Sequence, residues 1–309
     1  MPPSLPRTRP RRALLVGILA VLPWSWFLVR NLGWPAEVVA VAFPLIGGVL
    51  IVVLGIVAFS MRRIVPLAVA ASLLILTVVV TVLPRIPVRT PPPRSGVRLL
   101  SANVYELNRE PQAAAAALAS SDADIIVAVE PPPGFGRVFA SSDPSRTYAT
   151  EDTKSVIHSR FPIESEPIPS SLPPNRLTRA IVQGPAGPFV LYAVHAFNPA
   201  YESTFAQQLT FVALLRHAAL GETMPVVIAG DFNMSDRQQG YRDMTSSFRD
   251  ADRAGWAADT YDHGIWRALL LRIDYVFIEP SWCAADEHRV DVPGSDHEAV
   301  EASLGPCPG

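Results

Sequence analysis

Side chains that could perform chemistry recur where the apolar runs of this sequence begin or end. Asn103 closes the run "VRLLSAN", Glu130 follows "DIIVAV", and His195 follows "PFVLYAV". The complete set comprises Asn103, Glu130, His195, Asp231, Asn233, Asp274, Asp296 and His297. One such residue alone is usually a turn or cap residue. A whole series of them at strand ends predicts a site at one sheet edge, because rigid scaffolds present functional groups in this way.

The predicted site combines carboxylates, amides and imidazoles. Oxygen ligands that leave room for water are the ones that Mg²⁺ prefers, and no Cys/His cluster in the sequence indicates zinc. A hard cation beside two imidazoles suits hydrolysis at phosphorus, where catalysis consists of positioning and charge neutralisation. The residue types therefore predict a Mg²⁺-dependent phosphoric ester hydrolase in which Mn²⁺ can substitute.

Strands that alternate with helices are needed to position these residues. Short apolar runs predict strands at 97–104, 124–129, 154–158, 178–183, 188–194, 225–230, 271–278 and 297–303. Longer patterned runs predict helices at 110–120 and 202–220. Strands interleaved with helices are typical of an α/β layered domain.

Three apolar runs without charges precede this domain, at about 13–29, 38–59 and 64–83. Crossing about 30 Å of hydrocarbon takes roughly 20 helical residues, so the runs predict three transmembrane helices. Core helices of a soluble protein are the alternative, but such helices usually carry a polar face. A cleaved signal peptide is the alternative for the first run, but no small-residue cleavage site follows it. Residues 1–83 are therefore expected to have a lipid bilayer as partner.

The placement of arginine predicts the orientation of these helices. Four Arg precede the first run and Arg62 and Arg63 follow the second, whereas the first connection carries only Arg30 and Glu37. Because cytoplasmic connections are enriched in Lys and Arg, the N-terminus is expected inside and, after three spans, the C-terminal domain outside. Several Arg between 85 and 98 oppose this orientation. The expected location is the plasma membrane, with an extracytoplasmic domain.

Residues 84–96, "PRIPVRTPPPRSG", separate the predicted membrane anchor at 1–83 from the predicted catalytic domain at 97–309. Proline fixes φ and lacks an amide proton. The stretch is therefore expected to form an extended, semi-rigid linker.

Two cysteines, Cys283 and Cys307, flank predicted strands near the end of the domain. An even cysteine count in a domain expected outside the cytoplasm favours pairing. Two unrelated thiols are the alternative, but we predict a disulfide bond between them.

Seven short motifs follow one another from residue 101 onwards. They are "SAN" (101–103), "VE" (129–130), "HSRFP" (158–162), "VH" (194–195), "GDFN" (230–233), "RIDYVF" (272–277) and "GSDH" (294–297). In order and spacing they resemble the endonuclease/exonuclease/phosphatase family, which includes DNase I-like nucleases, exonuclease III-like repair enzymes, inositol phosphatases and sphingomyelinases. The resemblance covers about 97–305. It implies a four-layer α/β sandwich of two mixed β-sheets flanked by helices.

The resemblance also implies roles for the residues that would hold metal and water. Glu130 is implied as the main Mg²⁺ ligand, with Asn103 close by and Asp296 assisting. Asp231 is implied to align or deprotonate the attacking water.

Further residues are implied to handle the phosphate group. Asn233 and His195 would hold its oxygens, and His297 would stabilise the pentacovalent transition state or act as acid–base. Asp274 would hold His297 in the correct tautomer, as carboxylates do for catalytic histidines elsewhere. Arg179 would bind phosphate or brace the site, with a simple ion pair as the alternative.

Three functions are compatible with this sequence. The first is a nuclease-like phosphodiesterase, and the second is a phosphatase or phospholipase-type hydrolase acting on lipid head groups or small phosphoesters. The third, a catalytically silent binding module, is disfavoured by the intact residue set. Extended nucleic-acid binding draws on many Lys and Arg contacts, whereas this domain is acidic and Lys154 is its only lysine. Nothing in the sequence indicates a protein partner.

His158 is expected to face the surface.

Overall fold

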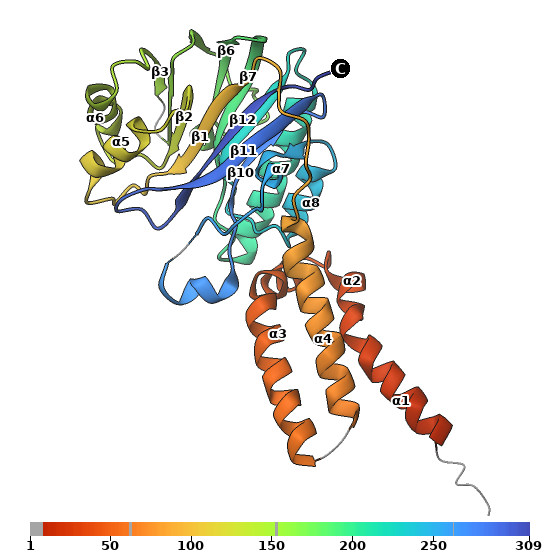
Figure 1. Cartoon of the computed structure of the whole chain (residues 1–309). Helices are drawn as coiled ribbons and strands as arrows, with labels where there is room; N and C mark the ends of the chain where they lie inside the picture. The colour runs from red at the N-terminus through yellow and green to blue at the C-terminus, as the bar shows by residue number, and fades with distance from the viewer. Residues whose placement is uncertain (1–8, 62–63, 152–153, 262) are drawn as a thin grey trace, which may run out of the picture. The chain divides into compact units, whose positions relative to one another are not determined.

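The computed structural model divides the chain into two compact units (Figure 1). The N-terminal unit is Met1–Pro84 and the C-terminal unit is Arg85–Gly309. The structure describes residues 9–61, 64–151, 154–261 and 263–309. The Arg62–Arg63 connection used above to predict orientation lies outside the described residues.

Among the described residues of the N-terminal unit, two helices are long and apolar enough to cross a membrane, Trp34–Ser60 and Ile64–Arg85. The prediction of three such helices was therefore wrong. The predicted span at 13–29 is divided into α1 (Arg9–Val21), the 3₁₀ turn η1 (Leu22–Ser25) and α2 (Trp26–Val29). Pro23 in η1 lacks an amide proton and locks φ, which interrupts the regular helix.

The two long helices, α3 (Trp34–Met61) and α4 (Ile64–Val82), pack against each other. A side chain at Gly47 would collide with Thr77 of α4, so glycine permits this close approach. Trp26, Phe43 and Leu76 belong to a small buried cluster in the same unit.

The segment predicted as a linker is bound along the C-terminal unit. After the 3₁₀ turn η2 (Leu83–Arg85), the Val88 amide donates to the Arg253 carbonyl at 2.6 Å. Thr90 Oγ1 donates to the Ala284 carbonyl at 2.8 Å, and the Arg94 amide donates to Pro306 at 2.9 Å. The segment is extended, as its prolines predict, but it packs on the unit that follows it.

The described residues of the C-terminal unit form two six-stranded mixed sheets. The first has the order β11-β12-β1-β2-β4-β3 and the second β5-β6-β7-β8-β10-β9. The strands of the first sheet are β1 (Val97–Asn103), β2 (Ile125–Val129), β3 (Tyr148–Glu151), β4 (Ser155–Ser159), β11 (Trp282–Asp291) and β12 (Glu298–Pro306). Those of the second are β5 (Ile163–Ser165), β6 (Leu177–Gly184), β7 (Gly187–His195), β8 (Val226–Asp231), β9 (Arg249–Asp250) and β10 (Asp274–Ile278).

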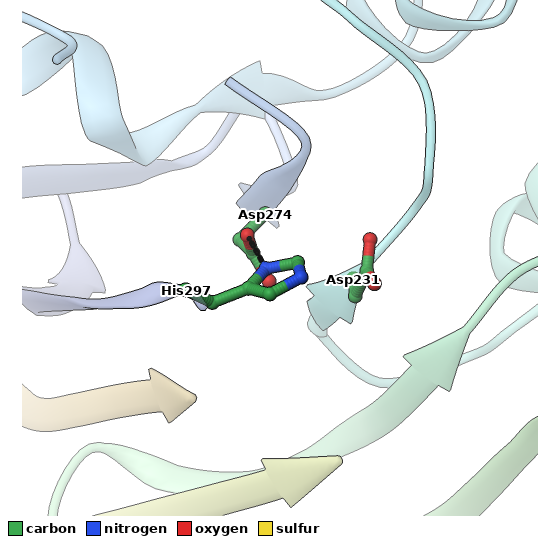
Figure 2. Close-up of side chains that lie close together, drawn as sticks. All are labelled: Asp231, Asp274 and His297. Carbon is green, nitrogen blue, oxygen red and sulfur yellow. Dashed lines mark hydrogen bonds and ion pairs between the residues drawn. The ribbon is translucent and has the colours of Figure 1, made fainter. Parts of the chain in front are cut away.

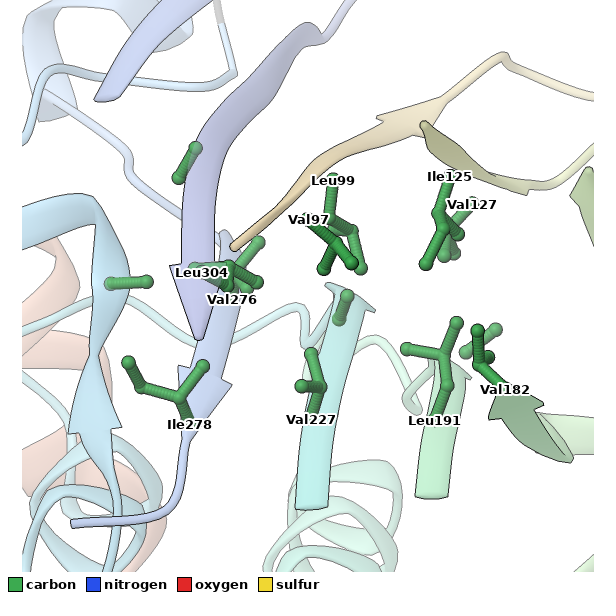
Figure 3. Close-up of a cluster of buried hydrophobic side chains, with 14 of the residues drawn as sticks. Val97, Leu99, Ile125, Val127, Val182, Leu191, Val227, Val276, Ile278 and Leu304 are labelled. Carbon is green, nitrogen blue, oxygen red and sulfur yellow. The ribbon is translucent and has the colours of Figure 1, made fainter. Parts of the chain in front are cut away.

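Helices cover the outer faces of both sheets and complete a four-layer sandwich, which confirms the predicted fold class of the domain. The helices are α5 (Pro111–Ala119), α6 (Phe135–Ser142), α7 (Glu202–Leu220) and α8 (Gln239–Thr245), with short 3₁₀ turns η3 (Pro174–Arg176), η4 (Ala251–Ala254) and η5 (Gly264–Leu269). Between the sheets lies a core of aliphatic side chains that includes Leu99, Val127, Leu191 and Val276 (Figure 3). Burial of such side chains holds the strands in register.

Two local findings bear on the predictions from sequence. His158 of β4 is buried and its ring packs 4.3 Å from that of Phe139, so the expectation of a surface position was wrong. The helix layer covers this face of the sheet, which a single strand pattern does not reveal. Cys283 and Cys307 form the predicted disulfide, with 5.0 Å between their Cα atoms.

Candidate active site

Strand ends from both sheets converge at one edge of the sandwich. β1 and β2 are parallel, so Asn103 and Glu130 leave the first sheet at the same end. β7 and β8 are also parallel, with His195 opposite Asp231. β10 runs antiparallel to β8 and begins with Asp274 opposite Asp231. The polar residues that follow apolar runs in the sequence therefore lie together at one edge of the two sheets.

Asp274 and His297 form a hydrogen-bonded pair. Asp274 Oδ2 lies 2.8 Å from His297 Nδ1, and Figure 2 shows the imidazole ring lying between Asp274 and Asp231. The amide of Asp274 donates to Thr260 Oγ1 at 3.1 Å, which fixes the start of β10. The Tyr261 ring meets the His297 ring edge-on, with 5.0 Å between centroids. The imidazole is therefore oriented by a carboxylate on one side and an aromatic ring on another.

The surroundings raise the pKa values of both His297 and Asp231. Burial alone would lower the pKa of His297, but the neighbouring carboxylates of Asp274, Asp231 and Asp296 raise it to about 10. Burial and repulsion from Asp274 raise the pKa of Asp231 to about 6. At neutral pH the site therefore holds a protonated imidazole beside a carboxylate that can accept a proton. Such separated acid and base groups are typical of catalytic sites.

Asp231 is fixed by two amide side chains. Asn103 Nδ2 donates to Asp231 Oδ2 at 3.0 Å, and the Asn233 backbone amide donates to Oδ1 at 2.7 Å. Asn233 Nδ2 also lies 3.2 Å from Oδ2. The φ of Asn233 is 51°, a left-handed conformation that Asn tolerates better than most residues.

Glu130 and His195 form a second contact at the same edge. His195 Nε2 lies 2.9 Å from Glu130 Oε1 and 4.0 Å from Asp231 Oδ2. Burial raises the pKa of Glu130, but hydrogen bonds from His195 and Asn103 and the charges of both histidines bring it below its usual value. The Glu130 side chain is 21% exposed, and its φ of 50° is strained for a glutamate.

Two groups of ligands at this edge could hold a metal ion. Asp231, Asp274 and His297 offer atoms within 4.8 Å of one another. We disfavour this buried group, because Asp274 and His297 already bond each other and Mg²⁺ prefers oxygen ligands and retained waters. Glu130 and Asn103 fit better, since they supply oxygens and the Glu130 carboxylate reaches solvent.

Asp296 and Arg179 are the remaining two predicted site residues, and they differ in their distance from the site. Asp296 Oδ1 is 4.0 Å from His297 Nε2, and its side chain is 22% exposed. Arg179 is not brought together with the others. Its guanidinium binds Glu222 at 2.9 Å through two nitrogens and Glu166 at 3.3 Å. The alternative of an ion pair is therefore what the structure contains.

Three residues that support the site were not singled out from the sequence. Thr260 and Tyr261 lie in a segment without a strand or helix pattern, so no periodicity marked them. Ser295 Oγ donates to the Asn103 carbonyl at 2.8 Å and accepts from the His297 amide at 3.0 Å. Its place within "GSDH" was the one signal that could have identified it.

Sequence comparison agrees with this geometry. Residues 100–297 match the model of the endonuclease/exonuclease/phosphatase family. The chain belongs to this family. No curated protein sequence matches the chain.

Solved structures share the family fold. An endonuclease/exonuclease/phosphatase from Beutenbergia cavernae is 18% identical, with a TM-score of 0.53 over 69% of this chain and 72% of that one. A humanized D. rerio TDP2 is 18% identical, with a TM-score of 0.56 over 69% and 100%. Sphingomyelinase C from Streptomyces griseocarneus is 14% identical, with a TM-score of 0.51 over 67% and 99%. At these identities the likeness is one of fold.

Proposed function

We propose that this protein is a membrane-anchored, Mg²⁺-dependent phosphoesterase that hydrolyses phosphodiester bonds in a nuclease-like manner. Family members are phosphoester hydrolases and are mostly metal-dependent. The observation that carries the proposal is the His297–Asp274 pair beside Asp231, because it unites an oriented acid with a carboxylate base.

Each side chain has a role in this proposal that its contacts support. Asp231 aligns the attacking water and accepts its proton, as its raised pKa favours. Protonated His297 donates to the phosphoryl group, and Asp274 keeps its tautomer and orientation. His195 and Asn233 hold phosphate oxygens from the side of β7 and β8.

Glu130 and Asn103 would hold the Mg²⁺, with Asp296 assisting. The ion would neutralise charge on the phosphate oxygens. Mn²⁺ can take the same oxygen ligands.

The second candidate function is hydrolysis of lipid head groups or small phosphoesters. It is supported by the two apolar helices, which would keep the enzyme beside lipid phosphates. One protein of similar fold is named a sphingomyelinase C and another is TDP2, so the fold alone is compatible with different substrates. An inert binding module is disfavoured by the complete and mutually bonded residue set.

Two helices with only 17% and 22% of their apolar windows buried support a membrane anchor. Arg62 and Arg63 lie between them in the sequence and favour a cytoplasmic connection, and we therefore propose that Arg85 and all that follows lie outside. With two spans instead of three, this orientation leaves the N-terminus on the same outer side, in place of the inner side expected from its four Arg. Arg85, which opposed this orientation, is paired with Asp236 and Asp259. The disulfide is in keeping with an oxidising compartment.

The test uses the purified full chain and a substrate panel of plasmid DNA, RNA, sphingomyelin, inositol phosphates and bis-p-nitrophenyl phosphate. We expect hydrolysis with Mg²⁺ or Mn²⁺ and none in EDTA. Glu130→Gln should lower turnover by at least about 100-fold, because metal charge stabilisation supplies several kcal/mol. Glu202→Gln, at an exposed position in α7, is the matched control and should be unchanged.

Full activity in EDTA would contradict the metal mechanism. Equal activity of the two glutamate variants would remove Glu130 from the metal site. Preferred cleavage of nucleic acids or of sphingomyelin would decide between the two candidate functions.

A further inference from the structure

Three large apolar side chains are exposed on two segments of the C-terminal unit that are each bonded to its first residue, Arg85. Trp256 is 58% exposed, Trp266 is 48% exposed and Leu270 is 37% exposed. We call these three residues the interfacial patch. Trp256 follows the turn η4, whereas Trp266 lies in η5 and Leu270 directly follows it. Large apolar side chains exposed on a folded domain can mark a surface that contacts something else.

Both segments of the interfacial patch are bonded to Arg85. The Ala257 amide, next to Trp256, donates to the Arg85 carbonyl at 3.3 Å. Arg85 Nη2 donates to the Leu270 carbonyl at 2.6 Å. Two sequence segments that are otherwise separate are therefore fixed to the same residue.

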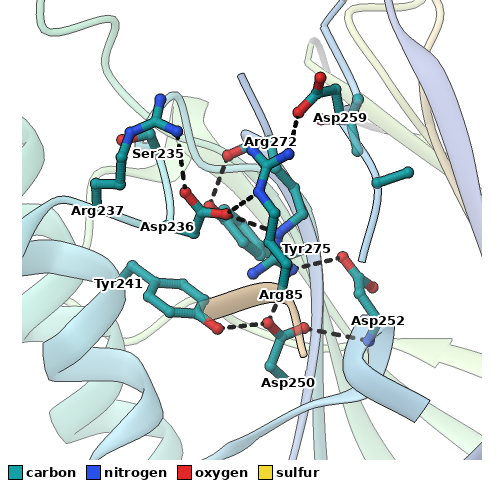
Figure 4. Close-up of polar contacts among 12 residues, drawn as sticks. Arg85, Ser235, Asp236, Arg237, Tyr241, Asp250, Asp252, Asp259, Arg272 and Tyr275 are labelled. Atoms are coloured by element: carbon teal, nitrogen blue, oxygen red, sulfur yellow. Dashed lines mark hydrogen bonds and ion pairs between the residues drawn. The ribbon is translucent and has the colours of Figure 1, made fainter. Parts of the chain in front are cut away.

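Arg85 is itself held firmly within the C-terminal unit. Its Nε lies 2.8 Å from Asp236, its Nη1 pairs with Asp259, and it is 8% exposed (Figure 4). Asp236 in turn lies 3.5 Å from Arg272, whose Nη1 bonds Asp250 at 2.8 Å. This buried ionic network fixes Arg85 within the C-terminal unit, since none of its members can move alone without leaving a buried charge unpaired.

Arg85 is also the last residue of an apolar helical stretch, Ile64–Arg85, with mean hydropathy 2.6. A helix of this kind that crosses a bilayer ends at the lipid–water interface, where Trp and Arg are enriched. The chain has no intervening residues between that helix and the side chain that holds the interfacial patch. The exposed residues of the patch are therefore within reach of the lipid head groups.

We propose that the interfacial patch docks on the same bilayer that anchors the chain, with Trp256, Trp266 and Leu270 inserted among the lipid head groups. The inference rests on the membrane anchoring in the proposed function. Amphipathic aromatic side chains lie favourably at this depth, where the ring is apolar and the indole N–H finds a partner.

The interfacial patch is connected to the active site. Tyr261 and Leu271 form an isolated β-bridge, and Trp266 and Leu270 lie in the loop between them. Tyr261 also bridges to His297 and packs against its ring. Tyr261, where this loop begins, therefore connects the docked segment directly to the catalytic histidine His297.

The experiment uses the full chain labelled with 5-fluorotryptophan in phosphatidylcholine nanodiscs. The six Trp resonances are assigned with single Trp→Phe variants and recorded with a phosphatidylcholine spin-labelled just below the head group. We expect the resonances of Trp256 and Trp266 to lose most of their intensity. Trp282, which is 4% exposed in the sandwich core, is the internal control and should keep its intensity.

A water-soluble gadolinium chelate is the complementary probe, because it reaches side chains exposed to water instead of lipid. Intensity of Trp256 and Trp266 that survives the lipid label but is lost with the chelate would overturn the docking proposal. The three Trp of the N-terminal unit separate this failure from failure of the anchor. If Trp24, Trp26 and Trp34 also survive the lipid label, the chain is not in the bilayer and the proposed function itself loses its membrane component.

Discussion

His158 is a buried base without a hydrogen-bond partner among the described residues. Neither ring nitrogen finds a donor or acceptor, and the side chain is 2% exposed. Burial and the nearby charge of Arg146 lower its pKa to about 4. The folded protein therefore keeps this imidazole neutral, whereas in the unfolded chain its pKa is near 6.5.

This difference makes stability depend on pH. The unfolded state binds a proton first, so the contribution of His158 is complete above pH 6.5 and is lost as the pH falls towards 4. Between pH 7 and pH 5 the loss should reach about 2 kcal/mol in the free energy of unfolding. His158→Leu should remove this part of the pH dependence, which thermal unfolding of the full chain at both pH values measures.

His217→Gln is the control, because His217 is exposed on α7. Its stability should follow that of the unmodified protein at both pH values. If His158→Leu did the same, the buried imidazole would not be responsible for the acid sensitivity.

The residue types at strand ends were enough to predict which residues form the site. They were not enough to predict what surrounds each side chain. Asn103, Glu130 and Asp231 meet at one edge because parallel strands end together. Arg179 has a similar sequence neighbourhood, yet its side chain leaves β6 towards Glu222. Which face of a strand is covered by helices depends on tertiary packing, and for this reason Arg179 and His158 were harder to place.

At the scale of elements, β8 approaches β7 unusually closely where the site begins. Gly230 has a φ of +140°, which side-chain-bearing residues rarely adopt, and a Cβ there would collide with the Val194 carbonyl. The next residue is Asp231, so the close approach determines where the carboxylate points. Glycine at this position is needed for both pairing and orientation.

Gly230→Ala should therefore lower the free energy of unfolding by more than about 1 kcal/mol and abolish metal-stimulated hydrolysis. Gly221→Ala, at the C-cap of α7 with a φ of −86°, is the matched control and should be close to neutral. Thermal unfolding and activity assays of the two variants check this. Equal stability of both variants would show that the collision is relieved at little cost.

The helices and strands that could be predicted from the sequence are those with continuous apolar runs. β1, β7 and α7 are found close to their expected bounds. β11 was not predicted, because "WCAADEHRVD" is half exposed and its register shifts between Ala285 and His288. A bulge breaks the period-two alternation on which strand prediction depends.

At the scale of the whole molecule, the orientation of the C-terminal unit can be measured. In a chain with Cys283→Ser and Cys307→Ser, we introduce Ser141→Cys on exposed α6 or Ser60→Cys at the end of the apolar helix. Ser141→Cys should react with a membrane-impermeant maleimide in intact cells. Ser60→Cys, beside Arg62 and Arg63, should react only after permeabilisation. The reverse pattern would place the active site in the cytoplasm.

Hydropathy alone overcounted the helices that are long enough to cross a membrane. The run at 13–29 is uncharged like its neighbours, but the structure divides it at η1, where Pro23 lies. Pro44, by contrast, is accommodated inside α3. The domain fold was predictable because its motifs are distributed over both sheets. The attachment of residues 86–94 was not, since it depends on carbonyls of Arg253 and Ala284 that are distant in sequence.

The strand β12 follows every other strand in the sequence, yet it lies inside its sheet, between β11 and β1. It pairs with the strand that is made first, joining Val97 to Leu304, and is preceded by His297. The first sheet therefore cannot be completed until β12 has been synthesised. In the topology and activity that we propose, the active site would therefore be completed only after the unit has crossed the membrane, away from the phosphoesters of the cell's interior.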